Sequence, residues 1–461
     1  MSDIRSTYTD SLNFFAGHKP VDLLKSYGSP LYVYNEGMLR RRAAELRDLV
    51  KLPNFRACYS AKANANPHLL RIIRSEGLLV DSMSPGELAM NRLAGFSRDQ
   101  IIYVCNNVHG DELAQAAISS RVVSVDSLSQ LALFGRTLQE RGIGQEYRRV
   151  MLRLNPGIGA GHHQKVVTAG KETKFGINPE DFGQAREICR QYGLALVGVN
   201  QHVGSLFMQA DAFLQAAEWL LQTVETLQAS NFFDGLEIID FGGGFGIPYH
   251  KYEGQTRLDL DELGTKLTAR LKEWISKTGY QGLFLIEPGR YLAAECGLLL
   301  GSVTAIKNNG PTRFACTDVG FNILPRPMLY DAFHDVEIYR GALNPEHAES
   351  SENNDCSQRP ELPQTLTGNI CESGDLLASG RLLPEIREHD LLGFLDAGAY
   401  CYAMSFPYNQ RVRPAEILIG LNNQGEAGKC DTPQGQVKLI RRRENLEDLL
   451  AQIPPLDDAR E

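Results

Sequence analysis

Short apolar runs alternate with longer amphipathic stretches over the first 290 residues of the chain. The stretches at 85–93, 179–192 and 212–229 carry apolar residues at helical spacing, whereas the runs are too short for helices and are rich in Val, Ile and Leu. This alternation predicts parallel strands that are connected by helices. The predicted strands are eight: 55–59, 78–80, 101–104, 122–125, 150–154, 196–203, 236–241 and 283–286.

Eight strand–helix units in about 250 residues match the size of a (β/α)₈ or TIM barrel. We therefore predict such a barrel over residues 39–295. A doubly wound open parallel sheet has the same alternation and is the alternative fold.

After residue 295 the pattern changes to strands with few long helices between them, which predicts a mostly β domain over 296–461 of the sandwich or Greek-key kind. We expect residues 1–38 to pack with this domain, with a strand near 32–34. Residues 344–365 are polar and predict an exposed insertion. The expected strands of the β domain are 298–305, 313–317, 366–370, 391–395, 415–421 and 436–441.

Composition narrows the class of protein. Of the 461 residues, 43% are hydrophobic and 22% charged, which is typical of a globular chain and excludes wholesale disorder. The net charge of -9 argues against a nucleic-acid binder. No apolar run approaches the roughly 18 residues of a membrane span, and the first residues lack a signal-peptide layout. The nine cysteines are scattered without a Cys-x-x-Cys pair, which predicts reduced thiols in a cytoplasmic protein.

Polar residues gather where the predicted barrel strands end, the edge at which barrel enzymes carry their chemistry. The residues in question are Lys62, Asp81, Arg153, Asn155, His202, Ser205, Asp240, Gly242–Gly246, Glu287 and Arg290.

One cofactor, pyridoxal 5′-phosphate, accounts for this set. A lysine can form a Schiff base with an aldehyde, and a glycine-rich turn can bring backbone N–H groups close to a phosphate. A carboxylate can keep a pyridine nitrogen protonated, and an imidazole can stack on the ring. Each residue also has a plainer interpretation: Lys62 as a surface lysine, Gly242–Gly246 as a tight turn, His202 as a core histidine, and Glu287 with Arg290 as a structural ion pair. The joint pattern favours the cofactor site.

The motifs resemble those of the fold-type III pyridoxal-phosphate decarboxylases, and among them the diaminopimelate decarboxylases. The resemblance spans nearly the whole chain and implies a barrel, a C-terminal β domain, and a homodimer whose active sites form at the subunit interface. A monomer is the alternative. The matching segments are 59–64, 81–87, 174–177, 202–205, 242–246, 287–290, 326–330, 371–375, 396–400 and 441–444.

The resemblance also implies roles for individual residues. Lys62 would carry the cofactor, Glu287 would pair with its ring nitrogen, and His202 would stack on its ring. Asp81 would orient Lys62 or His202, unless it caps the helix that follows. Cys371 of the partner subunit would be the acid that protonates the carbanion left by CO₂; as a lone cysteine it would be a buried apolar residue. The phosphate region would be bound by Ser205, Gly242, Gly243, Gly244 and Tyr400, and the cofactor site would also include Gly289 and Arg290.

Substrate selectivity would come from groups that bind the second amino-acid head of meso-diaminopimelate, which would lose CO₂ at its D-centre to give L-lysine. Arg290 and Arg326 could hold the distal carboxylate as bidentate forks, and Glu372 could pair with the distal ammonium. Tyr330 and Tyr400 could complete the substrate site. Arg326 as a plain surface arginine is the alternative.

Four departures from the family pattern leave other substrates open: Leu206–Phe207, Leu324, Cys401 and Phe406. The alternatives are a decarboxylase of D-lysine, D-ornithine or an L-ornithine-like amino acid, an amino-acid racemase on the same barrel, and a catalytically silent regulatory relative. Lys62 and Cys371 are both present, which argues against the silent relative. We expect no metal, membrane or nucleic-acid partner.

Overall fold

The computed structural model describes residues 4–156, 160–161, 174–341, 343, 359–420 and 435–454. The chain divides into two compact units. One, the barrel unit, contains residues 39–248 and 255–293; the other, the β unit, contains residues 1–38, 249–254 and 294–461. The segment 249–254, which the sequence pattern placed in the barrel, therefore belongs to the β unit. No described helix is long and apolar enough to cross a membrane.

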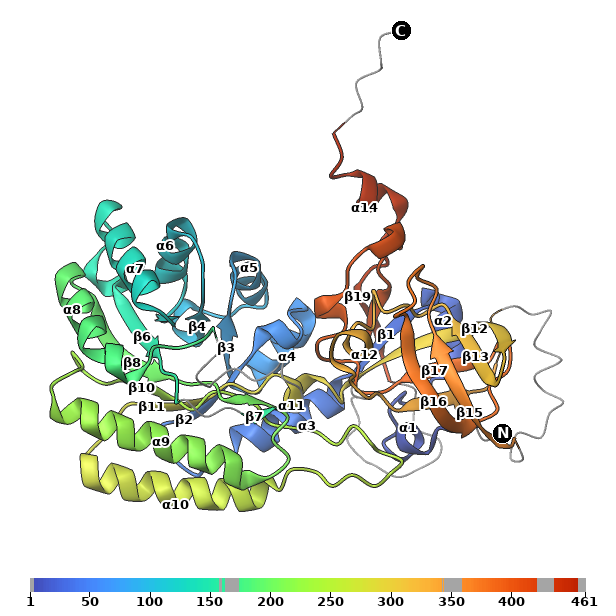
Figure 1. Cartoon of the computed structure of the whole chain (residues 1–461), viewed down its shortest axis with the longest axis horizontal. Helices are drawn as coiled ribbons and strands as arrows, with labels where there is room; N and C mark the ends of the chain where they lie inside the picture. The colour runs from blue at the N-terminus through green and yellow to red at the C-terminus, as the bar shows by residue number, and fades with distance from the viewer. Residues whose placement is uncertain are drawn as a thin grey trace, which may run out of the picture. The chain divides into compact units, whose positions relative to one another are not determined.

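The barrel unit contains a closed, all-parallel eight-stranded barrel, which confirms the predicted fold and rules out the open sheet (Figure 1). Its interior is formed by apolar strand residues such as Ile102, Met151 and Leu285, all fully buried. The strands, in the order in which they pair around the barrel, are β10 (Ile238–Asp240), β11 (Leu283–Ile286), β2 (Phe55–Tyr59), β3 (Leu79–Ser82), β4 (Ile101–Val104), β5 (Val122–Val125), β6 (Arg149–Arg153) and β8 (Ala195–Asn200).

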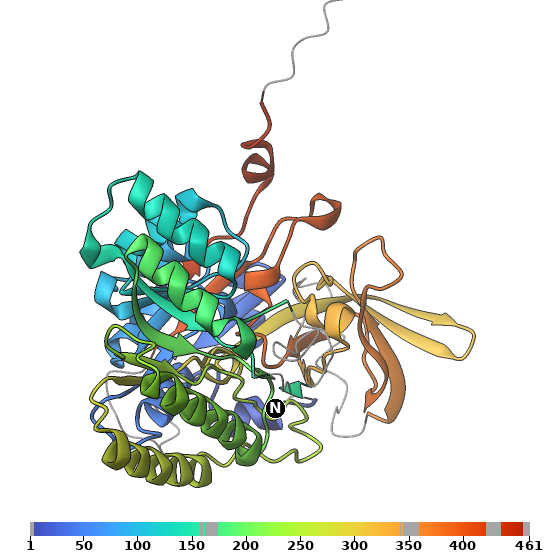
Figure 2. The ribbon, with the colours of Figure 1, turned by 60° about the vertical axis from the view of Figure 1, so that its left-hand side comes forward.

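Helices cover the outside of the barrel, and Figure 2 shows them from a second side. Their apolar faces are buried: α9, for example, buries Phe213, Leu220 and Val224 at helical spacing. The helices are α3 (Glu36–Arg47), α4 (Pro67–Ser75), α5 (Pro85–Leu93), α6 (Gly110–Ser119), α7 (Leu128–Glu140), α8 (Phe182–Tyr192), α9 (Ala210–Ala229), α10 (Leu260–Thr278) and the short α11 (Arg290–Ala293). Single 3₁₀ turns lie at η1 (Ala61–Ala63), η2 (Arg98–Gln100), η3 (Gln145–Tyr147) and η5 (Pro179–Asp181).

The predicted strand at 196–203 is too long. Strand β8 ends at Asn200, and the chain then turns into a two-residue strand, β9 (Gly204–Ser205), which pairs with β7 (Ala160–Gly161). The apolar run continues past the barrel strand because Val203 is buried in this turn.

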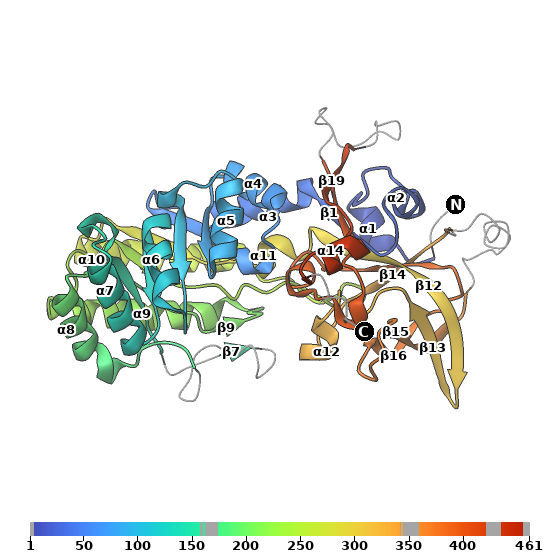
Figure 3. The same cartoon turned by 90° about the horizontal axis from the view of Figure 1, so that it is seen from above.

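The β unit is mostly β, as predicted, and it is built on one nine-stranded mixed sheet. Its long strand β12 (Gly297–Asn309) pairs with β1 (Leu31–Asn35) and β17 (Leu391–Phe394) in its first half and with β13 (Thr312–Thr317) in its second. Figure 3 shows β12 and β13 side by side, seen from above. The remaining strands are β14 (Val336–Tyr339), β15 (Glu361–Thr367), β16 (Leu376–Pro384), β18 (Ala415–Ile419) and β19 (Val437–Arg441). The helices are α1 (Thr7–Ser11), α2 (Pro20–Tyr27), α12 (Arg326–Tyr330) and α14 (Leu446–Leu450), with 3₁₀ turns η8 (Tyr402–Met404) and η9 (Tyr408–Gln410).

Strand β1 pairs on both sides, with β12 and β18, so the N-terminal segment contributes to the β unit as expected. Two predictions in this unit are wrong. The end of the expected insertion, 361–365, lies in β15, where Gln364 is 1% exposed and bonds to the backbone of β16; residues 344–358 lie outside the described residues. Strands β14 and β16 were missed, and β15 begins five residues before the strand expected at 366–370.

Candidate active site

Lys62 lies in the 3₁₀ turn η1, directly after β2. The turn is held by Asp81 at the end of β3. Ser60 Oγ donates to Asp81 Oδ2 at 2.8 Å, and the backbone N–H of Ala61 donates to Asp81 Oδ1 at 2.8 Å. A second anchor comes from the Ser60 N–H, which donates to the carbonyl of Pro288 at 3.0 Å. The backbone before Lys62 is thus bound from two neighbouring strand ends.

Asp81 orients the lysine turn and does not cap the following helix. Helix α5 is capped by Ser84, whose side chain accepts from the N–H of Glu87. Asp81 is fully buried, and burial together with the charge of Glu287 raises the pKa of its carboxyl, while Lys62 and the Ser60 hydroxyl oppose the rise. Of the two alternatives for Asp81, the structure favours the one in which it positions Lys62.

His202 lies after β8 and faces the glycine-rich loop that follows β10. The N–H of Gly243 donates to His202 Nδ1 at 3.1 Å, so the ring proton of a neutral imidazole lies on Nε2. Burial lowers the pKa of His202 well below its usual value, and the charges of Lys62 and Arg153 lower it further. His202 is therefore an uncharged ring at neutral pH, and such a ring can stack on a flat aromatic cofactor.

The glycines of the loop are required by backbone crowding. A Cβ on Gly243 would lie 2.1 Å from the carbonyl oxygen of Glu287, and one on Gly242 would lie 2.1 Å from that of Gln201. Gly242 also has φ +74°, a left-handed conformation that favours glycine. The glycines thus let the loop pack against the ends of β8 and β11.

Two residues assigned to the cofactor site meet in the structure. Arg290, at the start of α11, donates from Nη2 to Ser205 Oγ of β9 at 3.1 Å. Arg290 is 7% exposed. Gly289 directly precedes it, so the Glu287–Arg290 motif and the His202–Ser205 motif converge at one edge of the barrel.

Glu287, which follows β11, provides the strongest sign of an electrostatic site. Its carboxyl is 5% exposed, and within the described part of the chain its Oε1 is buried without a hydrogen-bond partner. Burial and the neighbouring carboxyl of Asp240 raise the pKa of Glu287 well above its usual value, while Lys62 and Arg153 oppose the rise. A buried acceptor of this kind fits a ligand that brings an N–H donor.

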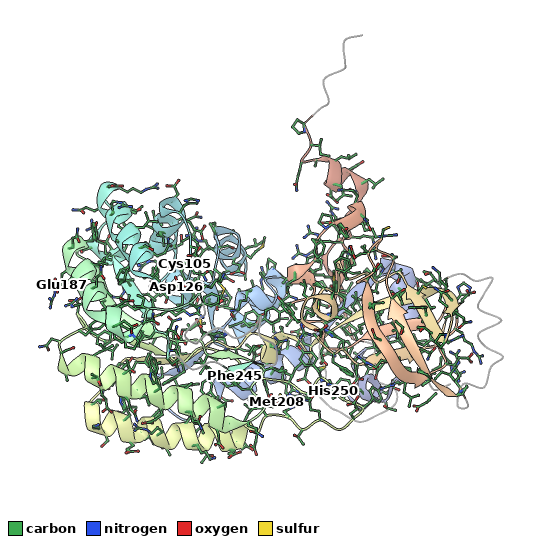
Figure 4. All side chains as sticks on the ribbon, in the orientation of Figure 1. Cys105, Asp126, Glu187, Met208, Phe245 and His250 are labelled. Atoms are coloured by element: carbon green, nitrogen blue, oxygen red, sulfur yellow. The ribbon has the colours of Figure 1, made fainter. Side chains whose placement is uncertain are left out.

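The departure Leu206–Phe207 holds the glycine-rich loop. The N–H of Phe207 donates to the carbonyl of Gly244 at 2.8 Å, and the N–H of Gly246 donates back to the carbonyl of Phe207 at 2.9 Å. Leu206 adopts φ 72°, rare for a leucine. Figure 4 labels Phe245 of the glycine-rich loop and Met208, which directly follows Phe207. A Cβ on Gly246 would lie 2.5 Å from the Met208 sulfur.

In the β unit, Cys371 and Glu372 lie in the exposed turn between β15 and β16. The base of the turn is buried: Asp375, 3% exposed, accepts from the N–H groups of Phe321 at 2.7 Å and Ile370 at 2.8 Å. The N–H of Cys371 donates to Asn409 Oδ1 at 2.8 Å. The motif therefore presents the thiol and the Glu372 carboxyl on a turn held from below, and Cys371 is not the buried apolar residue of the plainer interpretation.

Arg326 and Tyr330 lie in α12 of the same unit. Arg326 is 2% exposed, so it is not a plain surface arginine. His334 Nδ1 lies 2.7 Å from the Leu395 carbonyl oxygen and thus donates, which leaves Nε2 to accept from Arg326 Nη1 at 2.8 Å. The guanidinium also lies over the Tyr249 ring, 4.7 Å from its centroid.

Three other predicted positions of the β unit take defined places. Tyr400 has φ 60°, in a turn after β17. Cys401 is fully buried. Phe406 packs against Phe321, with ring centroids 5.7 Å apart, so this departure fills an aromatic cluster beside the base of the Cys371 turn.

Sequence reasoning missed Arg153 and Asp240 as site residues, although it noted both as polar strand ends. Arg153 is 9% exposed at the end of β6 and interacts with Glu287, Asp240 and Asp126. Figure 4 marks Asp126 and Cys105, at the ends of β5 and β4. The available signal was a charge at the end of a strand that is otherwise apolar, because such a charge must be compensated inside the barrel.

Comparison with known proteins gives a consistent picture. The family model described as "Pyridoxal-dependent decarboxylase, pyridoxal binding domain" matches residues 36–294. A diaminopimelate decarboxylase of Methanothermobacter thermautotrophicus is 37% identical over 437 residues, covering 94% of each chain. The diaminopimelate decarboxylase of Escherichia coli K12 is 31% identical over 442 residues, covering 92% of this chain and 94% of the relative. The crystal structure of diaminopimelate decarboxylase from M. jannaschii with L-lysine superposes with a TM-score of 0.79 at 27% identity, covering 95% of each chain.

Proposed function

Since the chain belongs to the pyridoxal-dependent decarboxylases, we propose that it removes the carboxyl group at the D-centre of meso-2,6-diaminopimelate and releases L-lysine and CO₂. The family assignment confirms the predicted enzyme class and the predicted cofactor, pyridoxal 5′-phosphate. The substrate proposal is supported by the diaminopimelate decarboxylases that match over more than nine-tenths of this chain.

The observation that carries the cofactor site is the buried Glu287 carboxyl, whose Oε1 has no partner among the described residues. A protonated pyridine nitrogen supplies the missing donor. When bound, pyridoxal 5′-phosphate supplies an aldehyde for the substrate amine and a ring that accepts the electrons of the broken bond.

The barrel residues then divide the work of binding and orientation. Lys62 provides the amine that holds the aldehyde, with its turn held by Asp81. His202 would stack as a neutral ring on the bound cofactor, and Glu287 would keep a proton on its ring nitrogen. Ser205, the backbone of Gly242–Gly244 and Tyr400 would hold the phosphate, and Gly289 and Arg290 would complete the cofactor site.

Cys371 donates the proton that replaces CO₂. The enzyme acts as a homodimer in which Cys371 and Glu372 enter the partner's site. The exposure of this turn, on a buried base, supports that arrangement. General acid catalysis of this kind contributes about 10²–10⁴-fold to rate.

The distal end of the substrate is recognised by charge. Arg290 and Arg326 bind the distal carboxylate, Glu372 binds the distal ammonium, and Tyr330 and Tyr400 add hydrogen bonds. A guanidinium held against His334 keeps two N–H edges in a defined plane, which suits a carboxylate.

The test is CO₂ release by the cofactor-loaded enzyme from meso-diaminopimelate, D-lysine, D-ornithine, L-lysine, L-ornithine and L-arginine. We expect strong preference for meso-diaminopimelate. Preference for a substrate without a distal carboxylate would overturn the substrate proposal and favour the alternative decarboxylases, with Leu206, Leu324 and Phe406 as the residues responsible. Racemisation without CO₂ release would overturn the reaction itself.

We propose a cytoplasmic location. The seven cysteines that the structure describes are all free thiols, as expected in a reducing compartment. Non-reducing mass analysis of the protein from its own cells tests this, and a disulfide in the native protein would contradict it.

A further inference from the structure

Two carboxyl groups lie side by side at the ends of neighbouring barrel strands. Asp240 is the last residue of β10 and Glu287 follows β11; these strands pair in parallel, with Asp240 opposite Leu285. The chain segments stay together past the strands, because the N–H of Glu287 donates to the carbonyl of Gly242 at 2.9 Å. Asp240 is fully buried and Glu287 is 5% exposed. Only Glu287 has a role in the proposed reaction.

The hydrogen bonds of this pair are incomplete in a specific way. Asp240 Oδ1 accepts from the N–H of Gly242 at 2.9 Å. Among the described residues, neither Asp240 Oδ2 nor Glu287 Oε1 has a hydrogen-bond partner, and both atoms are buried. An unsatisfied buried acceptor costs about 1–3 kcal/mol, and more when charged. One proton held between the two carboxyls would satisfy both sides of the pair.

The balance of the surrounding charges also favours the binding of one proton. Three carboxyls, those of Asp240, Glu287 and Asp81, interact directly with two cations, Lys62 and Arg153. One negative charge is thus in excess in a buried cluster, where an uncompensated charge is expensive. Burial accordingly raises the pKa of both members of the pair. The charge of Asp240 adds to the rise at Glu287 and the charge of Asp81 adds to the rise at Asp240, whereas the contact with Glu287 lowers the pKa of Asp240.

The groups around this cluster do not remove the excess. Glu87 acts on Lys62 and Asp126 acts on Arg153, so both add negative charge, and Asp126 is also faced by Lys174. His202 is neutral, and burial beside the three carboxyls raises the pKa of the Cys58 thiol, which keeps it neutral as well.

We infer that Asp240 and Glu287 share one proton before the cofactor binds, and that the pair gives up this proton when a ring nitrogen N–H occupies Glu287 Oε1. The inference rests on the proposed role of Glu287 in binding the cofactor. In the transfer, an O–H bond of the pair breaks. The proton goes to the ring nitrogen if that nitrogen arrives unprotonated, and to solvent if it arrives protonated. Asp240 is thus a positioning residue that sets the charge of Glu287.

The test is infrared difference spectroscopy on the full-length protein freed of cofactor. The probe is 4′-deoxypyridoxine 5′-phosphate, which keeps the ring and the phosphate but lacks the aldehyde that reacts with Lys62. We expect the C=O stretch of a protonated carboxylic acid in the protein alone, shifted in D₂O, and its loss when the probe binds. Asp240→Asn and Glu287→Gln should each abolish this difference band, because either change removes the excess charge and supplies an amide donor.

Asp396→Asn is the matched control. Burial raises the pKa of Asp396 in the β unit to about 7, so it can contribute a protonated carboxyl of its own, but one that the probe should not change. No carboxylic-acid band that disappears with the probe, or a band that survives in both Asp240→Asn and Glu287→Gln, would overturn the shared proton. Failure of the shared-proton inference is distinguishable from failure of the proposed function. If the enzyme releases CO₂ from meso-diaminopimelate but shows no difference band, only this inference is wrong. If the band is present but no CO₂ is released, only the substrate proposal is wrong.

Discussion

Replacing Lys251 by methionine removes a cation that bridges two buried carboxyls in the β unit. Lys251 Nζ lies 3.1 Å from Glu295 Oε1 and 3.0 Å from Asp396 Oδ1, and the three side chains are 4%, 0% and 1% exposed. Lys251→Met keeps the apolar stem and leaves both carboxyls without the cation that they share. Breaking a buried ion pair from one side costs about 3–5 kcal/mol. We expect that loss in the free energy of unfolding of the β unit at pH 8.

The loss depends on pH with a defined sign. The pKa of Asp396 is raised to about 7 with the lysine present, and removing the lysine raises it further. An acid whose folded-state pKa is raised destabilises the fold at high pH. This penalty begins to shrink as the pH falls below the folded-state pKa, and it vanishes only near the lower pKa of the unfolded chain. The cost of Lys251→Met should therefore be smaller at pH 6 than at pH 8.

Amide hydrogen exchange of strands β12 and β17 measures the β unit directly. At pH 8 their exchange through opening should accelerate by about 10²–10⁴-fold, since roughly 1.4 kcal/mol is a factor of ten. Lys266→Met is the control, because Lys266 pairs with Glu262 on the surface with its side chain 49% exposed, where water and salt screen the interaction. Equal exchange in the two variants at pH 8 would refute the reasoning.

Three further predictions concern the site. Gly243→Ala should weaken cofactor binding and destabilise the fold by about 1–3 kcal/mol or more, because its Cβ would lie 2.1 Å from a backbone oxygen. Cofactor titration and thermal melting measure both effects, with Gly183→Ala as the control because its Cβ would meet nothing within 4 Å. Equal behaviour of the two variants would contradict the prediction. Cys371→Ala should keep the cofactor but lower kcat by about 10²–10⁴-fold, and wild-type turnover, the result expected of Cys316→Ala, would rule out the proton donor. Asp81→Asn removes a charged acceptor from the lysine turn, so equilibrium dialysis should show cofactor affinity about 10–100-fold lower; unchanged affinity would exclude this positioning role.

The local pattern of apolar residues predicted most of the barrel strands. Five of the eight predicted strands match the observed ones within one residue at each end, because a parallel barrel strand is buried on both faces and appears as a short apolar run. The strands of the β unit were harder to predict from the sequence, since they are partly exposed. Gln364, for example, is buried by bonds to the backbone of β16 and gives no apolar signal.

The sequence by itself determined which chemistry this chain can perform. Lys62, His202, Glu287 and Cys371 are chemical groups whose types and order along the chain predict a pyridoxal-phosphate decarboxylase before any coordinates are known. The type of each residue can be known from the sequence alone. Apolar runs precede Lys62, His202 and Glu287, so the sequence also predicts that these three residues lie at strand ends.

Only the tertiary structure decided what the neighbours of those groups do. Asp81 could cap a helix or hold the lysine turn, and the choice follows from a contact with Ser60, 21 residues earlier. The inferred role of Asp240 depends on its interaction with Glu287, 47 residues later. The role of Lys251 depends on its ion pair with Asp396, 145 residues later. Such pairings are set by how strands close into a barrel or sheet, and a buried charge has energetic consequences only once its surroundings exclude water.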